Sequence, residues 1–385
     1  MPKILFLLED YNYFYSRKST GLFKIKYTYL QALNALLQEK YYQSNSLALA
    51  FESIGFETNI IVPEANPLQL QWLKEHNTLL LLKWWLLKPI RSFKARVLKQ
   101  YRSAYNTTHF MVLLKQVELL KPEYIYVYSN IYLTEKQVTV LKSYCRKIIL
   151  QWTTPLWKEF PKFPYHKFDI IVTAALQLHE YFKGKFYFTL YIQQAFDDSL
   201  LQTMNKIEHK NFDVTFIGGF TLGHNFRFEV LEFLLQNNIN LSVYGTGRES
   251  LPKNSLVFKY MKAPLFGLEM YNVYRKSKIA IHIHTTGYDD DQFDWNKYAG
   301  AKRLFEITGA GALLIASHQE NIKDLFIIDR EVVTFKTNAE LLYKVRYYLA
   351  NPSEAEEIAK RGQLRTLTSH SFVARAMELK PYLLE

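Results

Sequence analysis

The chain has 385 residues, of which 49% are hydrophobic and 22% charged, so it can bury sizeable cores and is long enough for two ordinary domains. This composition excludes a disordered chain.

The single cysteine, Cys145, has no partner for an internal disulfide, and the start MPKILFLLED lacks the basic and long apolar regions of a secretory signal. We therefore expect a cytoplasmic protein. The most apolar stretch, residues 79–87, is interrupted by Lys83 and falls short of the ~20 residues that a membrane span needs.

Short β-rich runs alternate with helix-length segments along the whole chain. The first series of expected strands covers residues 4–8, 57–62, 124–128, 148–152 and 168–172. The second covers residues 214–217, 241–244, 279–283, 312–316 and 332–335. This rhythm, which restarts after a polar stretch at residues 197–211, predicts an α/β protein with two doubly wound, Rossmann-like units. We place the domains at residues 1–204 and 205–369, followed by a C-terminal helix over 370–385 that crosses back to the first domain.

One helix has clear start and stop signals. Asn351 is a candidate N-cap, Pro352 suits the first helical position, and Glu354 is placed to reach back to the cap. Gly362 is placed to follow the helix end.

The common catalytic motifs are absent from the sequence. Residues 9–12 after the first expected strand read EDYN in place of GxGxxG, which disfavours a dehydrogenase. The chain also contains no Walker A, GxSxG, CxxC or HExxH sequence. P-loop hydrolysis, serine-esterase chemistry and a zinc site therefore lack their usual markers.

Candidate ligand-binding residues follow the expected strands, where open α/β sheets bind ligands. Gly218 and Gly219 would let a backbone approach a ligand, and His224 and Arg227 would meet phosphate; the alternative is a glycine turn with a surface arginine. Gly245, in a Gly-Thr-Gly turn, is a weaker signal.

Two further groups favour structural roles over metal binding. His282 and His284 lie on one face of a strand, where core or edge histidines are more common than a metal pair. Asp289, Asp290, Asp291 and Asp294 have the ligand type for a divalent cation, but a solvated acidic loop is the more common case.

The strongest signal is the segment KRLFEITGAG at residues 302–311, which predicts a helix that ends at glycines and leads into a strand. Arg303 and Glu306 are three residues apart and share a helical face, with Lys302 nearby. A structural salt bridge is one explanation. A guanidinium for a diphosphate and a carboxylate for ribose hydroxyls are also the pair that a sugar nucleotide requires.

At these residues the sequence resembles the group 1 GT-B glycosyltransferases, in particular the CgeB-like branch with its R-[LF]-x-E-x-x-G-x-G segment. Residues 213–218 (DVTFIG), His224 with Arg227, residues 278–284, and the closing pattern of residues 347–350, Gly362 and His370 extend the similarity over nearly all of residues 213–375. The N-terminal half matches more loosely, at Tyr41, residues 55–57 and 68–72, Gln151 and Pro155.

The resemblance implies a metal-independent glycosyltransferase with a GT-B fold, in which two Rossmann-like domains face a central cleft. The nucleotide-sugar donor would lie in the C-terminal domain and a saccharide or lipid-linked acceptor in the N-terminal domain. Lys302, Arg303, Arg227 and the backbone near Gly219 would stabilise the leaving diphosphate, while Glu306 would hold the ribose. The expected donor set is Gly218, Gly219, His224, Arg227, Gly245, Tyr260, Met261, Lys262, Lys302, Arg303, Glu306 and Gly309, in which residues 260–262 flank the base.

The catalytic base and the activity itself remain open at this stage. Glu9 and Asp10 are the nearest candidates for a general base, although a carboxylate there would equally cap the following helix. Tyr298 replaces a glutamate that many group 1 enzymes carry, and Ala301 replaces a frequent asparagine. These departures support an alternative, a GT-B-shaped binding protein without turnover.

The net charge of +12 attracts polyanions: nucleic acid, anionic lipid or phosphorylated small molecules. Residues 76–117 concentrate eight Lys and Arg residues among Leu, Trp and Phe, with no acidic residue. A nucleic-acid binder fits the donor pattern poorly. The segment has the ingredients of a helix lying on an anionic membrane, which would make the protein peripheral at the inner face, although Pro89 argues against one unbroken helix. The alternative is that Trp84 and Trp85 pack into the core and the basic residues form a solvated face.

Overall fold

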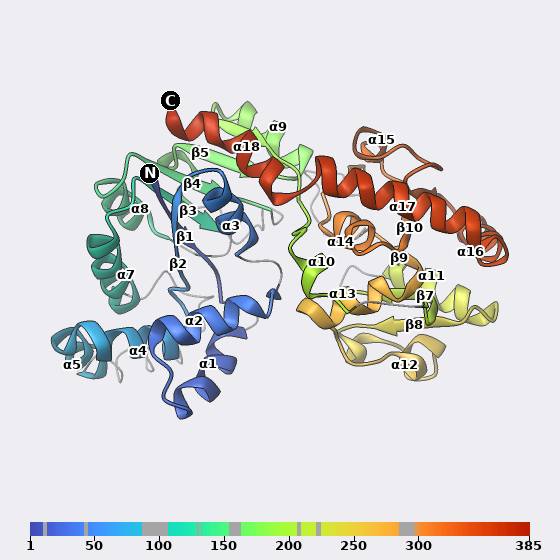
Figure 1. Cartoon of the computed structure of the whole chain (residues 1–385), viewed down its shortest axis with the longest axis horizontal. Coiled ribbons are helices and arrows are strands. Elements are labelled where there is room, and N and C mark those ends of the chain that lie inside the picture. Colours follow the sequence, from blue (N-terminus) through green and yellow to red (C-terminus); the bar gives the residue numbers. More distant parts are fainter. Residues whose placement is uncertain are drawn as a thin grey trace.

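The computed structural model describes residues 1–10, 14–41, 45–86, 107–128, 131, 133–153, 163–205, 209–220, 225–284, 297–298 and 300–385. It contains two parallel sheets, each flanked by helices (Figure 1). The expected α/β class and the two doubly wound units are confirmed.

The N-terminal sheet has the strand order β2-β1-β3-β4-β5-β6. Its strands are β1 (Lys3–Leu7), β2 (Glu57–Ile61), β3 (Tyr124–Tyr128), β4 (Lys147–Gln151), β5 (Ile170–Thr173) and β6 (Thr189–Tyr191). The helices of this half are α1 (Phe14–Lys24), α2 (Tyr29–Gln38), α3 (Ser46–Ser53), α4 (Asn66–His76), α5 (Thr78–Leu86), α7 (Thr107–Leu120), α8 (Glu135–Lys142) and α9 (Leu176–Gly184).

The C-terminal sheet has the order β11-β10-β9-β7-β8. Its strands are β7 (Phe212–Ile217), β8 (Leu241–Tyr244), β9 (Ser277–His282), β10 (Leu313–Ser317) and β11 (Val333–Phe335). The helices that follow β6 in the chain are α10 (Leu200–Thr203), α11 (Asn225–Gln236), α12 (Leu256–Tyr260), α13 (Gly267–Arg275), α14 (Arg303–Ala310), α15 (Ile322–Leu325), α16 (Asn338–Ala350), α17 (Pro352–Ser369) and α18 (Phe372–Leu384).

Both sheets are buried on two faces, which explains their nearly continuous aliphatic strands. In β1, for example, Ile4 and Phe6 join the core on one face while Leu5 and Leu7 join the core on the other. The ten expected strands all form, with ends that differ by at most two residues. The eleventh, β6, was not expected because only three residues pair and their run carries no clear alternation.

Two segments cross between the halves and run side by side. The linker after β6 pairs with the segment before α18: the Phe196 amide donates to the His370 carbonyl at 2.9 Å, and the Phe372 amide donates to the Phe196 carbonyl at 3.3 Å. After this crossing, α18 packs on α3 and contributes Ala376, Leu379 and Leu383 to the N-terminal core (Figure 1). The C-terminal helix is therefore part of the N-terminal half.

The expected end of the helix that starts at Pro352 is wrong. Gly362 does not follow the helix but lies inside α17, which continues to Ser369. Gly362 is required there by a close contact, since a Cβ atom would lie 2.2 Å from the carbonyl oxygen of Glu331. The cap is also different: Asn351 makes no side-chain cap bond, and Glu354 accepts from the Tyr347 hydroxyl at 2.8 Å.

Replacing Gly362 by alanine should destabilise the protein. Alanine is normally better than glycine in a helix interior by ~1 kcal/mol, but here its Cβ collides with a backbone oxygen. We expect the free energy of unfolding to fall by about 1–3 kcal/mol in urea titrations. Gly21→Ala in α1 is the matched control, because nothing lies within 4 Å of its Cβ position. A Gly362→Ala protein as stable as the Gly21→Ala protein would contradict the close contact.

Candidate functional site

The C-terminal sheet has its topological switch point between β7 and β9, because the chain leaves β7 toward β8 on one side and returns to β9 on the other. Ligands of open α/β sheets bind at this point, beyond the carboxyl ends of the strands. Arg227, in the first turn of α11, spans it. Its guanidinium donates to the Gly219 carbonyl after β7 and to the Ile283 carbonyl after β9, the latter at 3.1 Å. The side chain is buried and fixes the two loops together.

The loops after β7 and β8 approach each other more closely than side chains allow. A Cβ on Gly245 would lie 1.9 Å from the Gly218 carbonyl oxygen. Gly247 has a φ of +82°, and its Cβ would lie 1.8 Å from the Phe220 carbonyl oxygen. The structure therefore gives these glycines a packing role, because they let the loops after β7 and β8 lie in direct backbone contact.

The segment after α12 extends the edge beside β8. The Lys262 amide donates to the Val243 carbonyl at 2.8 Å, and the Lys262 ammonium lies 5.1 Å from the centre of the Tyr244 ring. Met261 is buried, whereas Tyr260 is about half exposed. Residues 260–262 thus lie at the outer side of the switch point, where the sequence predicted contacts to a base.

Helix α14 of the C-terminal half begins with two basic residues, Lys302 at its N-cap and Arg303 in its first turn. Arg303 donates to Glu306 Oε2 at 2.6 Å, and the Tyr271 hydroxyl donates to Oε1 at 3.0 Å. The Glu306 side chain is only 4% exposed, against 23% for Arg303. The structural salt bridge that the sequence left open is therefore present. Burial lowers the pKa of Lys302, which precedes Arg303, to about 8.

Two buried polar atoms near these cations have no hydrogen-bond partner among the described residues, His282 Nε2 and the Tyr274 hydroxyl oxygen. Burial, followed by the neighbouring His284, Arg227 and Arg303, lowers the pKa of His282 well below its usual value, so its imidazole is neutral. The Arg303 guanidinium lies 5.9 Å from the centre of the Tyr274 ring. The arrangement is a group of basic side chains beside two buried polar atoms that can still form hydrogen bonds, which suits an anion.

Sequence reasoning missed Tyr271 and Tyr274. Their spacing of three on α13 places both on its buried face, yet a buried tyrosine on an apolar face carries no sign of a charged neighbour.

Other expected residues lie elsewhere. Gly309 faces the linker between the halves, since a Cβ there would lie 2.4 Å from the Phe196 ring, which indicates a packing role. His224 and the acidic run from Asp289 to Asp294 fall outside the described residues. Within the described residues, no cluster of three metal-binding side chains occurs.

The two candidates for a base differ in their surroundings. Asp10 caps α1, because its carboxylate accepts from the Tyr15 amide at 2.8 Å, from the Ser16 amide at 3.3 Å and from the Ser16 hydroxyl. The capping alternative raised for this position is therefore what the structure shows for Asp10. Glu9 directly precedes it at the carboxyl end of β1 and is partly buried.

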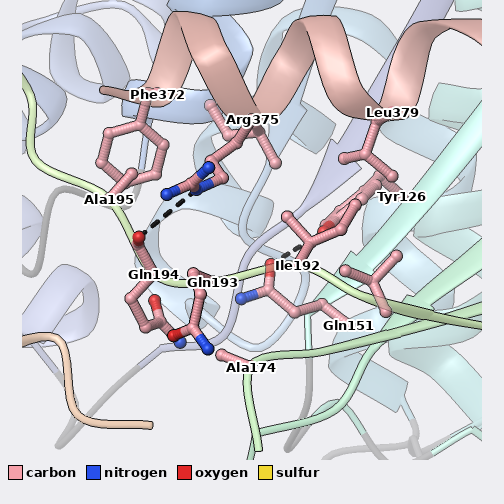
Figure 2. Close-up of a pocket in the computed structure, with 12 residues that line it drawn as sticks. Tyr126, Gln151, Ala174, Ile192, Gln193, Gln194, Ala195, Phe372, Arg375 and Leu379 are labelled. Atoms are coloured by element: carbon pink, nitrogen blue, oxygen red, sulfur yellow. Dashed lines mark hydrogen bonds between the residues drawn. The ribbon is translucent and has the colours of Figure 1, made fainter. Parts of the chain in front are cut away.

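A small cavity of about 30 Å³ lies at the carboxyl ends of β3, β4 and β5, under the crossing and α18 (Figure 2). Its polar lining consists of Tyr126, Gln151, Gln193, Gln194 and Arg375.

Comparisons with known proteins agree with this architecture. Residues 227–380 match the model of a family described as glycosyl transferase-like. The fold is similar to that of a glycosyltransferase from Rickettsia africae (TM-score 0.56, 11% identity, 100% and 99% of the two chains). It is equally similar to Anabaena HepE in complex with UDP and glucose (TM-score 0.56, 11% identity, 100% of each chain).

A third similar structure is the sucrose-phosphate synthase of Thermosynechococcus elongatus (TM-score 0.53, 11% identity, 99% and 98% of the chains). No curated protein matches in sequence. The expected GT-B fold and the resemblance to GT-B glycosyltransferases are confirmed.

Removing Arg303 should destabilise the fold, because the buried Glu306 carboxylate loses its cation. We expect Arg303→Ala to lower the free energy of unfolding by about 1–3 kcal/mol. Adding Glu306→Gln should recover part of this loss, so the two changes are non-additive. Lys115→Ala is the control, since Lys115 and Glu118 form an exposed pair with the same spacing and a distance of 2.6 Å, and its effect should be small. Strict additivity of the Arg303 and Glu306 changes would show that the pair does not interact.

Proposed function

We propose that this chain, which has the GT-B fold and a glycosyl transferase-like C-terminal part, transfers a sugar from a nucleotide-sugar donor to an acceptor held by its N-terminal half. The observation that carries this proposal is the cationic switch point. Arg227 joins the ends of β7 and β9, and Arg303 begins α14. Nε2 of His282, which has no hydrogen-bond partner in the described part of the chain, lies near both arginines. The complex of the similar HepE with UDP and glucose supports a nucleoside diphosphate sugar as donor.

The chemistry requires stabilisation of a diphosphate leaving group. As the bond from the anomeric carbon to the diphosphate oxygen breaks, its electron pair passes to the diphosphate. Lys302 and Arg303 supply positive charge for these oxygens, and Arg227 holds the loop carbonyls in place. An acceptor hydroxyl oxygen forms the new bond and gives its proton to a base, for which we propose Glu9, because the Asp10 carboxylate already accepts bonds from α1.

Binding of the donor involves an exchange at Glu306. Its two oxygens accept from Arg303 and Tyr271. We propose that Arg303 turns to the diphosphate, which leaves Oε2 of Glu306 to accept from a ribose hydroxyl. Residues 260–262 lie beside the base. In this scheme basic side chains replace a divalent cation, so transfer proceeds without a metal.

A panel of nucleotide sugars, scored for released nucleoside diphosphate with and without EDTA, tests the proposal. We expect turnover of at least one donor, unchanged by EDTA. Binding of a donor without any turnover would favour the GT-B-shaped binding protein. A loss in EDTA that Mg²⁺ restores would overturn metal independence and direct attention to Asp289, Asp291 and Asp294.

Donor affinity should fall as the pH rises through 8. Lys302 has a pKa of about 8 in place of its ordinary 10.5, so it is cationic below pH 8 and neutral above it. Losing one charge-assisted contact should raise the donor Kd about tenfold between pH 7 and pH 9. In titration calorimetry Lys302→Arg should flatten this profile, because arginine stays charged. The same slope in both proteins would exclude Lys302 as its source.

We also propose reversible attachment to an anionic membrane through α5 and the basic segment that follows. No helix in the described part of the chain is long and apolar enough to cross a membrane. Helix α5, at the outer end of the N-terminal half (Figure 1), nevertheless exposes 79% of Leu79, 61% of Leu82 and 78% of Leu86. Trp84 is buried in the core, as the packing alternative expected, whereas Trp85 is half exposed beside the leucines. The basic residues 88–102 lie outside the described residues.

Co-sedimentation with vesicles tests this attachment. Wild type should pellet with phosphatidylserine-containing vesicles more than with phosphatidylcholine vesicles, since each basic residue near an anionic surface contributes about 1 kcal/mol. Leu82→Gln with Leu86→Gln should reduce pelleting several-fold. Leu364→Gln is the control, because Leu364 is 62% exposed on α17 in the other half. Equal pelleting with both lipids would contradict the attachment.

A further inference from the structure

The cavity at the carboxyl ends of β3, β4 and β5 is lined by polar groups that can form further hydrogen bonds. The Tyr126 hydroxyl donates to Gln151 Oε1 at 2.9 Å, and Figure 2 shows the Gln151 amide turned into the cavity. Gln193 donates through its amide nitrogen to Tyr191, while its buried Oε1 has no hydrogen-bond partner among the described residues. Amide groups both donate and accept hydrogen bonds, and buried acceptors such as Gln193 Oε1 are normally hydrogen-bonded. A bound group that donates a hydrogen bond would satisfy this oxygen.

Among the described residues that line the cavity, one side chain is charged, and its charge is paired. This residue, Arg375, is buried and donates to Glu378, to His370 Nδ1 at 2.7 Å and to the Gln194 carbonyl at 3.4 Å (Figure 2). Burial lowers the pKa of His370 to about 4, so this histidine is neutral at physiological pH. A charged ligand would lose its hydration here without gaining a counter-ion.

The rest of the wall is apolar, from Leu47, Ile192, Phe372 and Leu379. With a volume of about 30 Å³, the cavity holds about two water molecules or one small hydroxyl-bearing group. It does not hold a whole sugar ring.

The cavity also adjoins the donor half. The Lys302 ammonium lies 5.8 Å from the centre of the Phe372 ring. A Cβ on Gly300 would lie 3.0 Å from the carbonyl oxygen of Ala174, which lines the cavity. Residues 300–302 lead directly into α14, so a group in the cavity lies next to the helix that carries Arg303.

We propose that this cavity is a subsite for the acceptor and that it receives a hydroxyl or hydroxymethyl group of an uncharged saccharide. The role of this saccharide as acceptor rests on the proposed function, whereas the preference for an uncharged saccharide follows from the lining of the cavity alone. Gln193 Oε1 accepts a hydrogen bond from the hydroxyl, the Gln151 amide donates to the hydroxyl oxygen, and the Phe372 and Leu379 side chains contact the carbon atoms of the sugar.

Saturation-transfer NMR on the full chain tests binding without turnover. The probes are the methyl glycosides of glucose, galactose and N-acetylglucosamine, against glucuronic acid and N-acetylneuraminic acid. Neutral glycosides should bind, and Gln193→Leu, which keeps the size and removes the amide, should weaken them about 3- to 10-fold, as expected for one lost hydrogen bond. Gln202→Ala, which alters an exposed glutamine on α10, should leave binding unchanged.

The outcomes separate this subsite from the glycosyl transfer. Acidic sugars that bind as well as neutral ones would overturn the neutral preference. Neutral binding that Gln193→Leu does not change, or the absence of saccharide binding to a folded protein, would overturn the subsite even if the donor panel shows turnover. Neutral binding lost in Gln193→Leu, with no donor turned over, would support the subsite and refute the transfer.

Discussion

The bridge that Arg227 makes across the switch point is the interaction on which the candidate site depends. Parallel strands leave their terminal carbonyls unpaired at one edge, and those of Gly219 and Ile283 converge on one buried guanidinium. The arginine satisfies both oxygens and places a fixed positive charge where the loops meet. His282, Arg303 and the glycine contacts after β7 and β8 all lie around this centre. A lysine at this position would offer no planar fork for two divergent carbonyls.

A second constraint holds the halves together at their shared edge. Asp197, next to the crossing, accepts from the Lys40 ammonium and from the Ser46 hydroxyl, each at 2.7 Å. Burial opposes ionisation of this carboxyl, but the bonds from Lys40, Ser199 and Ser46 outweigh it and lower the pKa. The linker is thereby fixed to the N-terminal half just before it enters the C-terminal half. The cavity beneath α18 consequently lies at a fixed junction with the segment that leads into α14.

The fold was predictable because its determinants are local and strongly patterned. Buried parallel strands read as aliphatic runs, and Gly311 ends α14 with a φ of +90°, as the glycines at residues 309–311 suggested. What sequence could not predict depends on contacts between distant segments. A glycine in this position of the pattern is typical of a helix end. The sequence does not show that Gly362 lies against the Glu331 carbonyl, which leaves no room for a side chain. Similarly, spacing paired Arg303 with Glu306, but neither the burial of that carboxylate nor the hydroxyl of Tyr271 on its other oxygen is visible in the sequence.

The return of α18 has a consequence for how the protein forms during synthesis. Ala376, Leu379 and Leu383 complete the core around α3 and β1, although nearly the entire chain separates them from those elements. The N-terminal half therefore cannot reach its final packing as the ribosome releases it, and it exposes the α3 surface until residues 372–384 emerge. The C-terminal half has all its strands and their covering helices in one continuous stretch. We therefore expect the N-terminal half to complete its packing after the C-terminal half during co-translational folding.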